Sequence, residues 1–330
     1  MTTIKVAMFS AKEYDRKSFE HHNHGNITFE YLDAQLTRKT VALAQSANAV
    51  CVFVNDELNA QVLSELKQLG INIVVLRCAG FNNVDLDAAK QLDISVARVP
   101  AYSPEAVAEH TIALMLTLNR KLHKAYNRTK EDNFSLTGLL GFNVHGKTIG
   151  LIGTGKIGLA VAKILSGFGV TLLATDPIES LDAAELGVEY VDLKTLLRRS
   201  DIVSLHCPLS TSTHHLLNAD TIAMMKSGVM IINTGRGGLI DSKCLIDNLK
   251  SGHIGYLALD VYEQESELFF EDRSCSIVQD DIFQRLLTFP NVLITGHQGF
   301  FTEEALTQIA TTTISNIECL VSGESCENLI

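Results

Sequence analysis

Short apolar runs rich in β-branched residues alternate along the chain with amphipathic stretches of helical period. The runs lie at residues 4–9, 50–54, 73–76 and 94–99, and then near Ile149, Leu172, Ile202, Met230, Leu257 and Leu293. Strands that alternate with helices in this way form parallel sheets that carry helices on both faces. The pattern therefore predicts an α/β protein with two Rossmann-like, doubly wound parallel-sheet units.

A long helix is predicted between the two series of strands. Ser103 can cap its start, Pro104 can occupy its first position, and Glu105 favours the positive end of the helix dipole. The body of this helix, as far as Arg120, is apolar enough to be largely buried. Residues 302–322 also have a helical pattern, and this last helix could return to pack on the first unit.

Length and charge narrow the class of protein. At roughly 100 to 200 residues per domain, 330 residues predict two domains. Hydrophobic residues make up 46% and charged residues 20% of the chain, which is an ordinary globular composition. The 27 Lys and Arg against 38 Asp and Glu give a formal net charge of −11, which repels nucleic-acid phosphates and anionic lipids. We therefore expect neither nucleic acid nor a membrane as a partner.

The cysteine pattern argues against disulfides and against a metal site. The seven cysteines are odd in number, scattered, and without a C-x-x-C pair. The first residues lack the apolar core of a signal peptide, and no run approaches the ~18 apolar residues that span a bilayer. These features predict a cytoplasmic protein without a bound metal.

The strongest local signal is a strand that leads directly into a glycine-rich turn and a helix at residues 148–158. The glycines of the G-x-G-x-x-G pattern are Gly153, Gly155 and Gly158. In such a turn the first glycine permits the tight bend, the second lets the backbone approach a pyrophosphate, and the third allows the helix to pack closely on the strand. The N–H groups at the helix start can then bind the anion.

The next strand ends at Asp176, 18 residues after Gly158. This is near the ~20 residues expected for the acid that binds the adenosine ribose hydroxyls. A carboxylate there would repel a 2′-phosphate, and residues 177–179 offer no Arg or Lys to neutralise one. A solvated aspartate beside a glycine-rich turn is the alternative, but strand, glycines, helix and acid together favour NAD(H) over NADP(H).

Three polar residues lie at predicted strand ends in the second series, namely Arg236, Glu265 and His297. Ligands bind at the carboxyl edge of such sheets. A guanidinium can pair with a carboxylate and polarise a carbonyl, a histidine can deliver a proton to a developing alkoxide, and a neighbouring glutamate favours the imidazolium. Taken singly, each residue could instead be a surface charge, one acid of an acidic loop, or a histidine bonded at a strand end. Their spacing alone does not assemble a site.

The motifs around these residues resemble those of the D-isomer-specific 2-hydroxyacid dehydrogenase family. They are N-T-x-R-G at residues 233–237, L-D-V-x-x-x-E at 259–265 and G-H-Q at 296–298. Residues 77–85, the stretch from Arg98 and the L-F-F-E-D segment from Leu268 are most similar to the fermentative D-lactate dehydrogenases of that family. The resemblance covers essentially the whole chain and implies NADH-dependent, reversible reduction of pyruvate to D-lactate.

The resemblance also implies roles for individual residues. Arg236 would bind and polarise the substrate, His297 would be the acid/base, and Glu265 would tune it. Backbone at Cys78, Ala79 and Gly80 would hold the substrate carboxylate, and Tyr102 and Phe300 would shape the pocket. Besides the three glycines, the residues implied to line the NAD site are Lys156, Ile157, Asp176, Cys207, Pro208, Thr213, Thr234, Gly235, Arg236 and Asp260.

The family fold implies a substrate domain of residues 1–101 and 299–330 and an NAD-binding domain of residues 102–298, with catalysis in the cleft between them. Family habit and the buried helix from Pro104 suggest a homodimer or homotetramer. Two alternatives remain open: a D-2-hydroxyacid dehydrogenase of broader specificity, and a non-catalytic, NAD(H)-sensing protein like the corepressors among the family's relatives. One residue departs from the expected pattern, because Gly299 follows Gln298 where alanine is commoner and could loosen the wall around Phe300.

Overall fold

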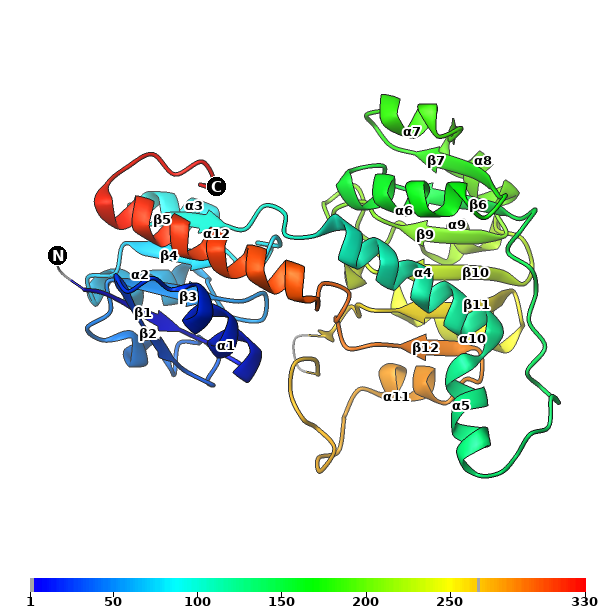
Figure 1. The fold of residues 1–330 in the computed structure, drawn as a ribbon, viewed down its shortest axis with the longest axis horizontal. Coiled ribbons are helices and arrows are strands. Elements are labelled where there is room, and N and C mark those ends of the chain that lie inside the picture. The colour runs from blue at the N-terminus through cyan, green and yellow to red at the C-terminus, as the bar shows by residue number, and fades with distance from the viewer. Residues whose placement is uncertain (1–2, 266–267) are drawn as a thin grey trace. The chain divides into compact units, whose positions relative to one another are not determined.

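The computed structural model describes residues 3–265 and 268–330. The chain forms two compact units, one of residues 1–103 with 301–330 and the other of residues 104–300. Each unit contains its own parallel sheet (Figure 1). The prediction of an α/β protein with two doubly wound parallel sheets is therefore confirmed.

The first unit is built on a five-stranded sheet of order β2-β1-β3-β4-β5. Its strands are β1 (Ile4–Met8), β2 (Ile27–Tyr31), β3 (Ala49–Val52), β4 (Ile73–Leu76) and β5 (Ser95–Arg98). Its helices are α1 (Glu13–His22), η1 (Val41–Ala44), α2 (Ala60–Gln68), α3 (Leu86–Gln91) and α12 (Glu303–Ser322). The sheet order reverses direction between β1 and β3, which is a common doubly wound arrangement.

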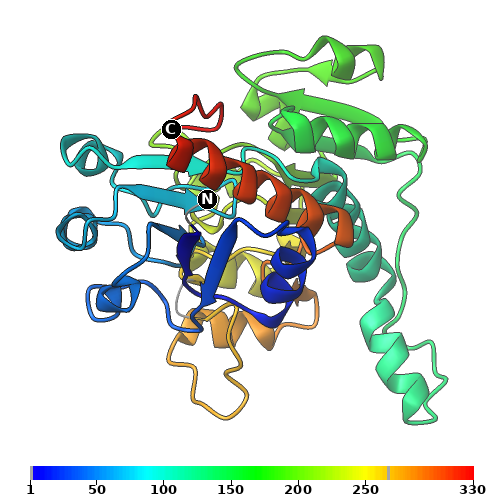
Figure 2. The same cartoon turned by 60° about the vertical axis from the view of Figure 1, so that its left-hand side comes forward.

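The C-terminal helix α12 belongs to this first unit. Thr302 caps it by accepting a hydrogen bond from Ala305 N–H, and Gly323 ends it in the left-handed conformation at φ 75°. The helix packs on α1, β4 and β5, and it lies beside α1 in both views (Figures 1 and 2). After it, the last residues return to β5, where Leu329 pairs antiparallel with Ala97.

The second unit contains a seven-stranded sheet of order β12-β11-β10-β9-β6-β7-β8. Its strands are β6 (Thr148–Ile152), β7 (Thr171–Thr175), β8 (Glu189–Tyr190), β9 (Ile202–Leu205), β10 (Val229–Asn233), β11 (Ile254–Leu259) and β12 (Val292–Ile294). Its helices are α4 (Pro104–Arg120), α5 (Leu122–Lys130), α6 (Lys156–Ser166), α7 (Leu181–Glu185), α8 (Leu193–Arg199), α9 (Ala219–Ala223), η2 (Gly237–Leu239), α10 (Ser242–Lys250) and α11 (Asp281–Leu287).

Strand side chains of the second unit supply two apolar layers, one on each face of the sheet. In β10, Met230 and Ile232 pack with residues of α4 and α6, whereas Ile231 packs with residues of α8 and α10. This alternation explains why the buried strands have continuous apolar sequences. Among the described residues, no helix is long and apolar enough to cross a membrane.

The sequence pattern did not predict two short edge strands, β2 and β8. In β2 only Ile27 is buried, so this strand lacks the continuous apolar run of a central strand. The other, β8, has two residues at the opposite edge of the larger sheet. The other strands, the helix from Pro104 and the C-terminal helix form where the pattern predicts them.

Candidate active site

The glycine-rich turn joins β6 to α6 at the point where the order of the larger sheet reverses, between β6 and β9. Gly153 has φ +100°, and a Cβ there would lie 2.7 Å from the backbone nitrogen of Cys207. A Cβ on Gly158 would lie 2.1 Å from the carbonyl oxygen of Gly153. Glycine at both positions therefore lets the turn, the start of α6 and the segment after β9 approach this closely.

Gly155 has a different reason to be glycine. It precedes the first turn of α6, and a Cβ built on it would meet no atom within 4 Å. The space that a side chain would fill is therefore open, beside N–H groups that have no partner within the helix. Such a cradle at a sheet's switch point fits a dinucleotide pyrophosphate. Lys156 and Ile157 are the first two residues of α6.

Asp176 follows β7, and its carboxylate is tied to the same turn. Its Oδ2 accepts a hydrogen bond from Thr154 N–H at 2.7 Å, and its Oδ1 accepts one from Ile178 N–H at 2.9 Å. Tyr190 of β8 donates to the Thr154 hydroxyl at 2.8 Å, which ties Thr154 to that edge strand. The Thr154 hydroxyl also donates to Oδ2 at 3.3 Å, so about one of the four acceptor positions of the carboxylate remains for a ribose hydroxyl.

Other residues predicted to line the NAD site lie in the segments that follow β9 and β10. Burial raises the pKa of the Cys207 thiol to about 11, so it stays protonated at neutral pH and is unsuited to nucleophilic chemistry. Thr213 donates to the Pro208 carbonyl at 2.6 Å. The Thr234 hydroxyl is buried and lies 2.9 Å from that of Thr111 in α4.

Arg236 lies in a tight loop after β10 that buried Asn233 organises. The side-chain oxygen of Asn233 accepts from Gly235 N–H at 3.0 Å, and its amide donates to the Arg236 carbonyl at 2.9 Å. The Arg236 guanidinium donates from Nη1 to the Gly235 carbonyl at 2.7 Å. A Cβ on Gly237 would lie 2.1 Å from the backbone of Tyr262, so glycine there lets the loop pack on the segment after β11.

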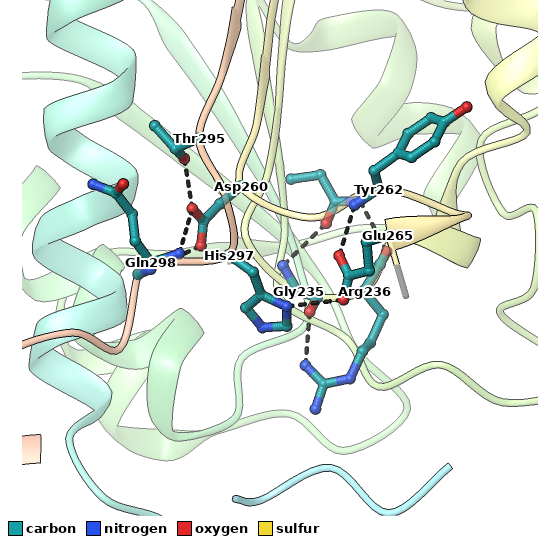
Figure 3. Close-up of polar contacts among 10 residues, drawn as sticks. Gly235, Arg236, Asp260, Tyr262, Glu265, Thr295, His297 and Gln298 are labelled. Atoms are coloured by element: carbon teal, nitrogen blue, oxygen red, sulfur yellow. Dashed lines mark hydrogen bonds and ion pairs between the residues drawn. The ribbon is translucent and has the colours of Figure 1, made fainter. Parts of the chain in front are cut away.

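Glu265 and His297 come from different strand ends and meet in a hydrogen bond. The imidazole Nδ1 lies 2.8 Å from Glu265 Oε1, while Oε2 accepts from Tyr262 N–H at 2.9 Å (Figure 3). The two side chains are only 15% and 19% exposed. With Nδ1 bonded to a carboxylate, Nε2 is the ring nitrogen left for proton transfer. Figure 3 shows the imidazole and the Arg236 guanidinium directed to the same side of the sheet edge.

Asp260 fixes the loop that carries His297. Its buried carboxylate accepts hydrogen bonds from Gln298 N–H at 2.9 Å and Gly299 N–H at 2.8 Å. His110 Nε2 and the Thr295 hydroxyl also bond it (Figure 3 shows the contacts of Thr295 and Gln298). Burial alone would raise the pKa of Asp260, but these hydrogen bonds outweigh it and lower that pKa.

The same loop bends sharply at His297. Its backbone has φ +54°, in the left-handed region that non-glycine residues seldom adopt, and its N–H donates to the Asp260 carbonyl at 2.7 Å. A Cβ on Gly299 would lie 3.0 Å from the Asp260 carboxylate and 3.3 Å from the His110 ring. The glycine therefore serves a close approach of Asp260 rather than a loose wall.

The residues predicted to contact substrate belong to both units. Cys78, Ala79, Gly80 and Tyr102 lie in the first unit, and Phe300, which is buried, ends the second. Sequence reasoning missed His110, Thr295 and Asn233. Asn233 lies within a recognised motif, whereas His110 had one signal, an imidazole within an otherwise apolar helix.

Comparisons with known proteins agree with this geometry. A family model described as "D-isomer specific 2-hydroxyacid dehydrogenase, NAD binding domain" matches residues 112–299. A D-lactate dehydrogenase of Escherichia coli is 56% identical over 326 residues, which are 98% of this chain and 99% of the relative. The chain belongs to the D-isomer-specific 2-hydroxyacid dehydrogenase family.

Solved structures of family members have the same fold. The apo-structure of the Escherichia coli D-lactate dehydrogenase aligns with a TM-score of 0.91 at 53% identity, covering 99% of this chain and 100% of that one. A structure titled as the pyruvate reductase of Chlamydomonas reinhardtii aligns with a TM-score of 0.93 at 43% identity, covering 99% of both chains. As a 2-hydroxyacid dehydrogenase of this family, the chain is an NAD-dependent enzyme, and the predicted cofactor is confirmed.

Proposed function

We propose that this dehydrogenase reduces pyruvate to D-lactate with NADH, reversibly. The observation that carries the proposal is the 2.8 Å pair of His297 and Glu265 at the sheet edge that also presents Arg236. Two family members with high overall similarity are named for D-lactate and for pyruvate, the Escherichia coli and Chlamydomonas reinhardtii enzymes described above.

In this proposal each side chain has one task. NADH, when bound, supplies the hydride that C2 of the 2-oxoacid accepts. His297 holds a proton on Nε2 and gives it to the alkoxide oxygen, a service worth ~100- to 10,000-fold in rate. The Glu265 carboxylate orients the imidazole through Nδ1. Arg236 pairs with the substrate carboxylate and polarises the carbonyl, since its planar fork matches both oxygens.

The cofactor would be held by the glycine turn and by residues near it. We propose that Gly153, Gly155, Gly158 and the start of α6 take the pyrophosphate and that Asp176 takes the ribose hydroxyls. We propose the remaining NAD contacts from the residues named above after β9, β10 and β11. Asp260 already accepts four hydrogen bonds from the chain, so a contact with the nicotinamide carboxamide would have to share or displace one of them.

The domain roles complete the proposal. The unit of residues 104–300 would bind NAD, and the unit of residues 1–103 and 301–330 would contribute substrate contacts. Backbone at Cys78, Ala79 and Gly80 would take the substrate carboxylate, while Tyr102 and Phe300 would limit the side chain at C3.

The test is a panel of 2-oxoacids assayed with NADH and with NADPH, followed by chiral analysis of the product. The proposal predicts the highest kcat/KM for pyruvate with NADH, and D-lactate as product. Equal or faster turnover of phenylpyruvate, 2-oxoisocaproate or hydroxypyruvate would overturn the lactate assignment and favour the broader dehydrogenase. NADH binding without turnover of any 2-oxoacid would favour the sensing alternative.

We further propose that the enzyme is a homodimer or homotetramer. The segment after α5 exposes large apolar side chains, with Phe134 71%, Leu136 83% and Leu140 85% exposed. Figure 2 shows α5 and this segment extending beyond the seven-stranded sheet. Light scattering after size-exclusion chromatography would refute this with a mass of about 36 kDa.

All seven cysteines are free, which supports the proposal of a reducing cytoplasm.

A further inference from the structure

In the loop after β4, the carbonyl groups of residues 78–80 all accept hydrogen bonds. Val99 N–H donates to the Cys78 carbonyl at 3.2 Å, the Arg98 guanidinium donates to the Ala79 carbonyl at 2.6 Å, and the Cys78 thiol donates to the Gly80 carbonyl at 3.3 Å. Three successive carbonyl oxygens are thus occupied by donors of the same unit. Within the described chain, the N–H groups of Ala79 and Gly80 donate to no protein acceptor. A loop with bonded carbonyls and free amides is suited to an anion.

Arg98 makes the charged contact in this arrangement. It ends β5, and Nη1 reaches Ala79 while the guanidinium lies over the Phe81 ring at 4.9 Å. One side chain therefore holds the loop at two points, through a charge-assisted hydrogen bond and a cation–π contact. Its positive charge, on a guanidinium that bonds the Ala79 carbonyl, also favours an anion at the neighbouring amides of Ala79 and Gly80.

The C-terminal segment anchors Arg98 in turn. Arg98 N–H donates to the Asn328 carbonyl at 3.1 Å, and its own carbonyl accepts from the Asn316 amide of α12 at 3.0 Å. Asn328 also donates to Asn316 at 2.8 Å, so both contacts of Arg98 belong to one network. The end of the chain thus fixes the backbone from which Arg98 reaches the loop.

We propose that Arg98 is a positioning residue for the substrate carboxylate. It withdraws the Ala79 carbonyl and thereby holds the Ala79 and Gly80 amides ready for the anion, without itself touching the reacting atoms. This inference rests on the proposed function, since it takes the anion to be the carboxylate of a 2-oxoacid. A purely structural role for Arg98 would lower stability but leave the KM for pyruvate unchanged.

The variant that tests this is Arg98→Gln, with Arg38→Gln as its matched control. Arg38 belongs to the same unit and makes one exposed ion pair with Glu65 at 3.1 Å. For Arg98→Gln we expect the KM for pyruvate to rise about tenfold and the inhibition constant of oxamate, a pyruvate analogue with the same carboxylate, to rise in parallel. We expect kcat to stay within about threefold and the Kd for NADH, from fluorescence titration, to be unchanged. Arg38→Gln should match the wild type in every constant.

Three results would decide against the proposal. A KM and an oxamate constant within twofold of wild type for Arg98→Gln would overturn it, as would equal losses in the Kd for NADH and the KM for pyruvate. If Arg98→Gln does not fold, Arg98→Lys decides, because lysine keeps the charge but loses the planar group over Phe81. An intermediate KM supports the proposal, and a wild-type KM overturns it. Failure of the wild type with every 2-oxoacid would instead overturn the proposed function.

Discussion

Replacing Glu265 with glutamine tests how the carboxylate supports His297. The two oxygens of Glu265 accept from His297 Nδ1 and from Tyr262 N–H, whereas a glutamine offers one oxygen and one donor group. In Glu265→Gln the single oxygen can no longer accept both from an Nδ1–H of His297 and from the Tyr262 N–H. A hydrogen bond to a charged group is worth about 1.5 to 3 kcal/mol, and the low exposure of this pair leaves little solvent screening. At 1.36 kcal/mol per factor of ten, the expected loss in kcat/KM is about 10- to 150-fold.

The assay is steady-state NADH oxidation with pyruvate between pH 5.5 and 8.

The chain supplies a matched control in Glu263→Gln. Glu263 also accepts from a histidine, His215 at 2.7 Å, and from a backbone N–H, that of Ser242 at 3.2 Å. The two variants should therefore lose similar thermal stability, while Glu263→Gln keeps kcat/KM within about threefold of wild type. Equal losses of rate in the two variants, or a rate in Glu265→Gln that matches wild type at every pH, would refute the reasoning.

Three further outcomes follow from the same geometry. Asp176→Ala should raise the KM for NADH about tenfold and improve use of NADPH, and an unchanged ratio of the two cofactors would remove Asp176 from this role. Arg236→Lys keeps the charge but loses the planar fork, so we expect a fall of about 100-fold in kcat/KM, and wild-type kinetics would exclude the proposed pairing. Burial lowers the pKa of His206 to about 4, so between pH 6.5 and 4 this histidine is protonated in the unfolded state and neutral in the folded state. The contribution of His206 to the free energy of unfolding is therefore full above pH 6.5 and falls toward pH 4 by about 3 kcal/mol, so urea unfolding should find a steeper loss of stability in the wild type than in His206→Gln.

Local chemistry made the cofactor turn predictable from the sequence. Gly158 is required by the nearby backbone of Gly153, and Gly153 is required by the backbone of Cys207 after the neighbouring strand β9. The order of strand, glycines and helix in the sequence indicates both close approaches. The end of β7 at Asp176 is fixed by the same short-range pattern. Central strands were equally visible, since burial on both faces demands continuous apolar runs.

The convergence of distant side chains was not predictable from spacing. Glu265 and His297 are 32 residues apart, and only the family resemblance joined them before the structure brought them within 2.8 Å. The hydrogen bond between His110 and Asp260 joins residues 150 positions apart and depends on how α4 packs against the sheet. The two missed strands, β2 and β8, lie at sheet edges, where partial exposure removes the apolar signal.

The central claim, that His297 is the acid/base of an NAD-dependent reduction, is tested most directly by the turnover of His297→Gln. With pyruvate and NADH we predict that kcat falls at least ~100-fold, while fluorescence titration gives an unchanged Kd for NADH. A variant that binds NADH normally and keeps more than about a tenth of wild-type kcat would contradict the account.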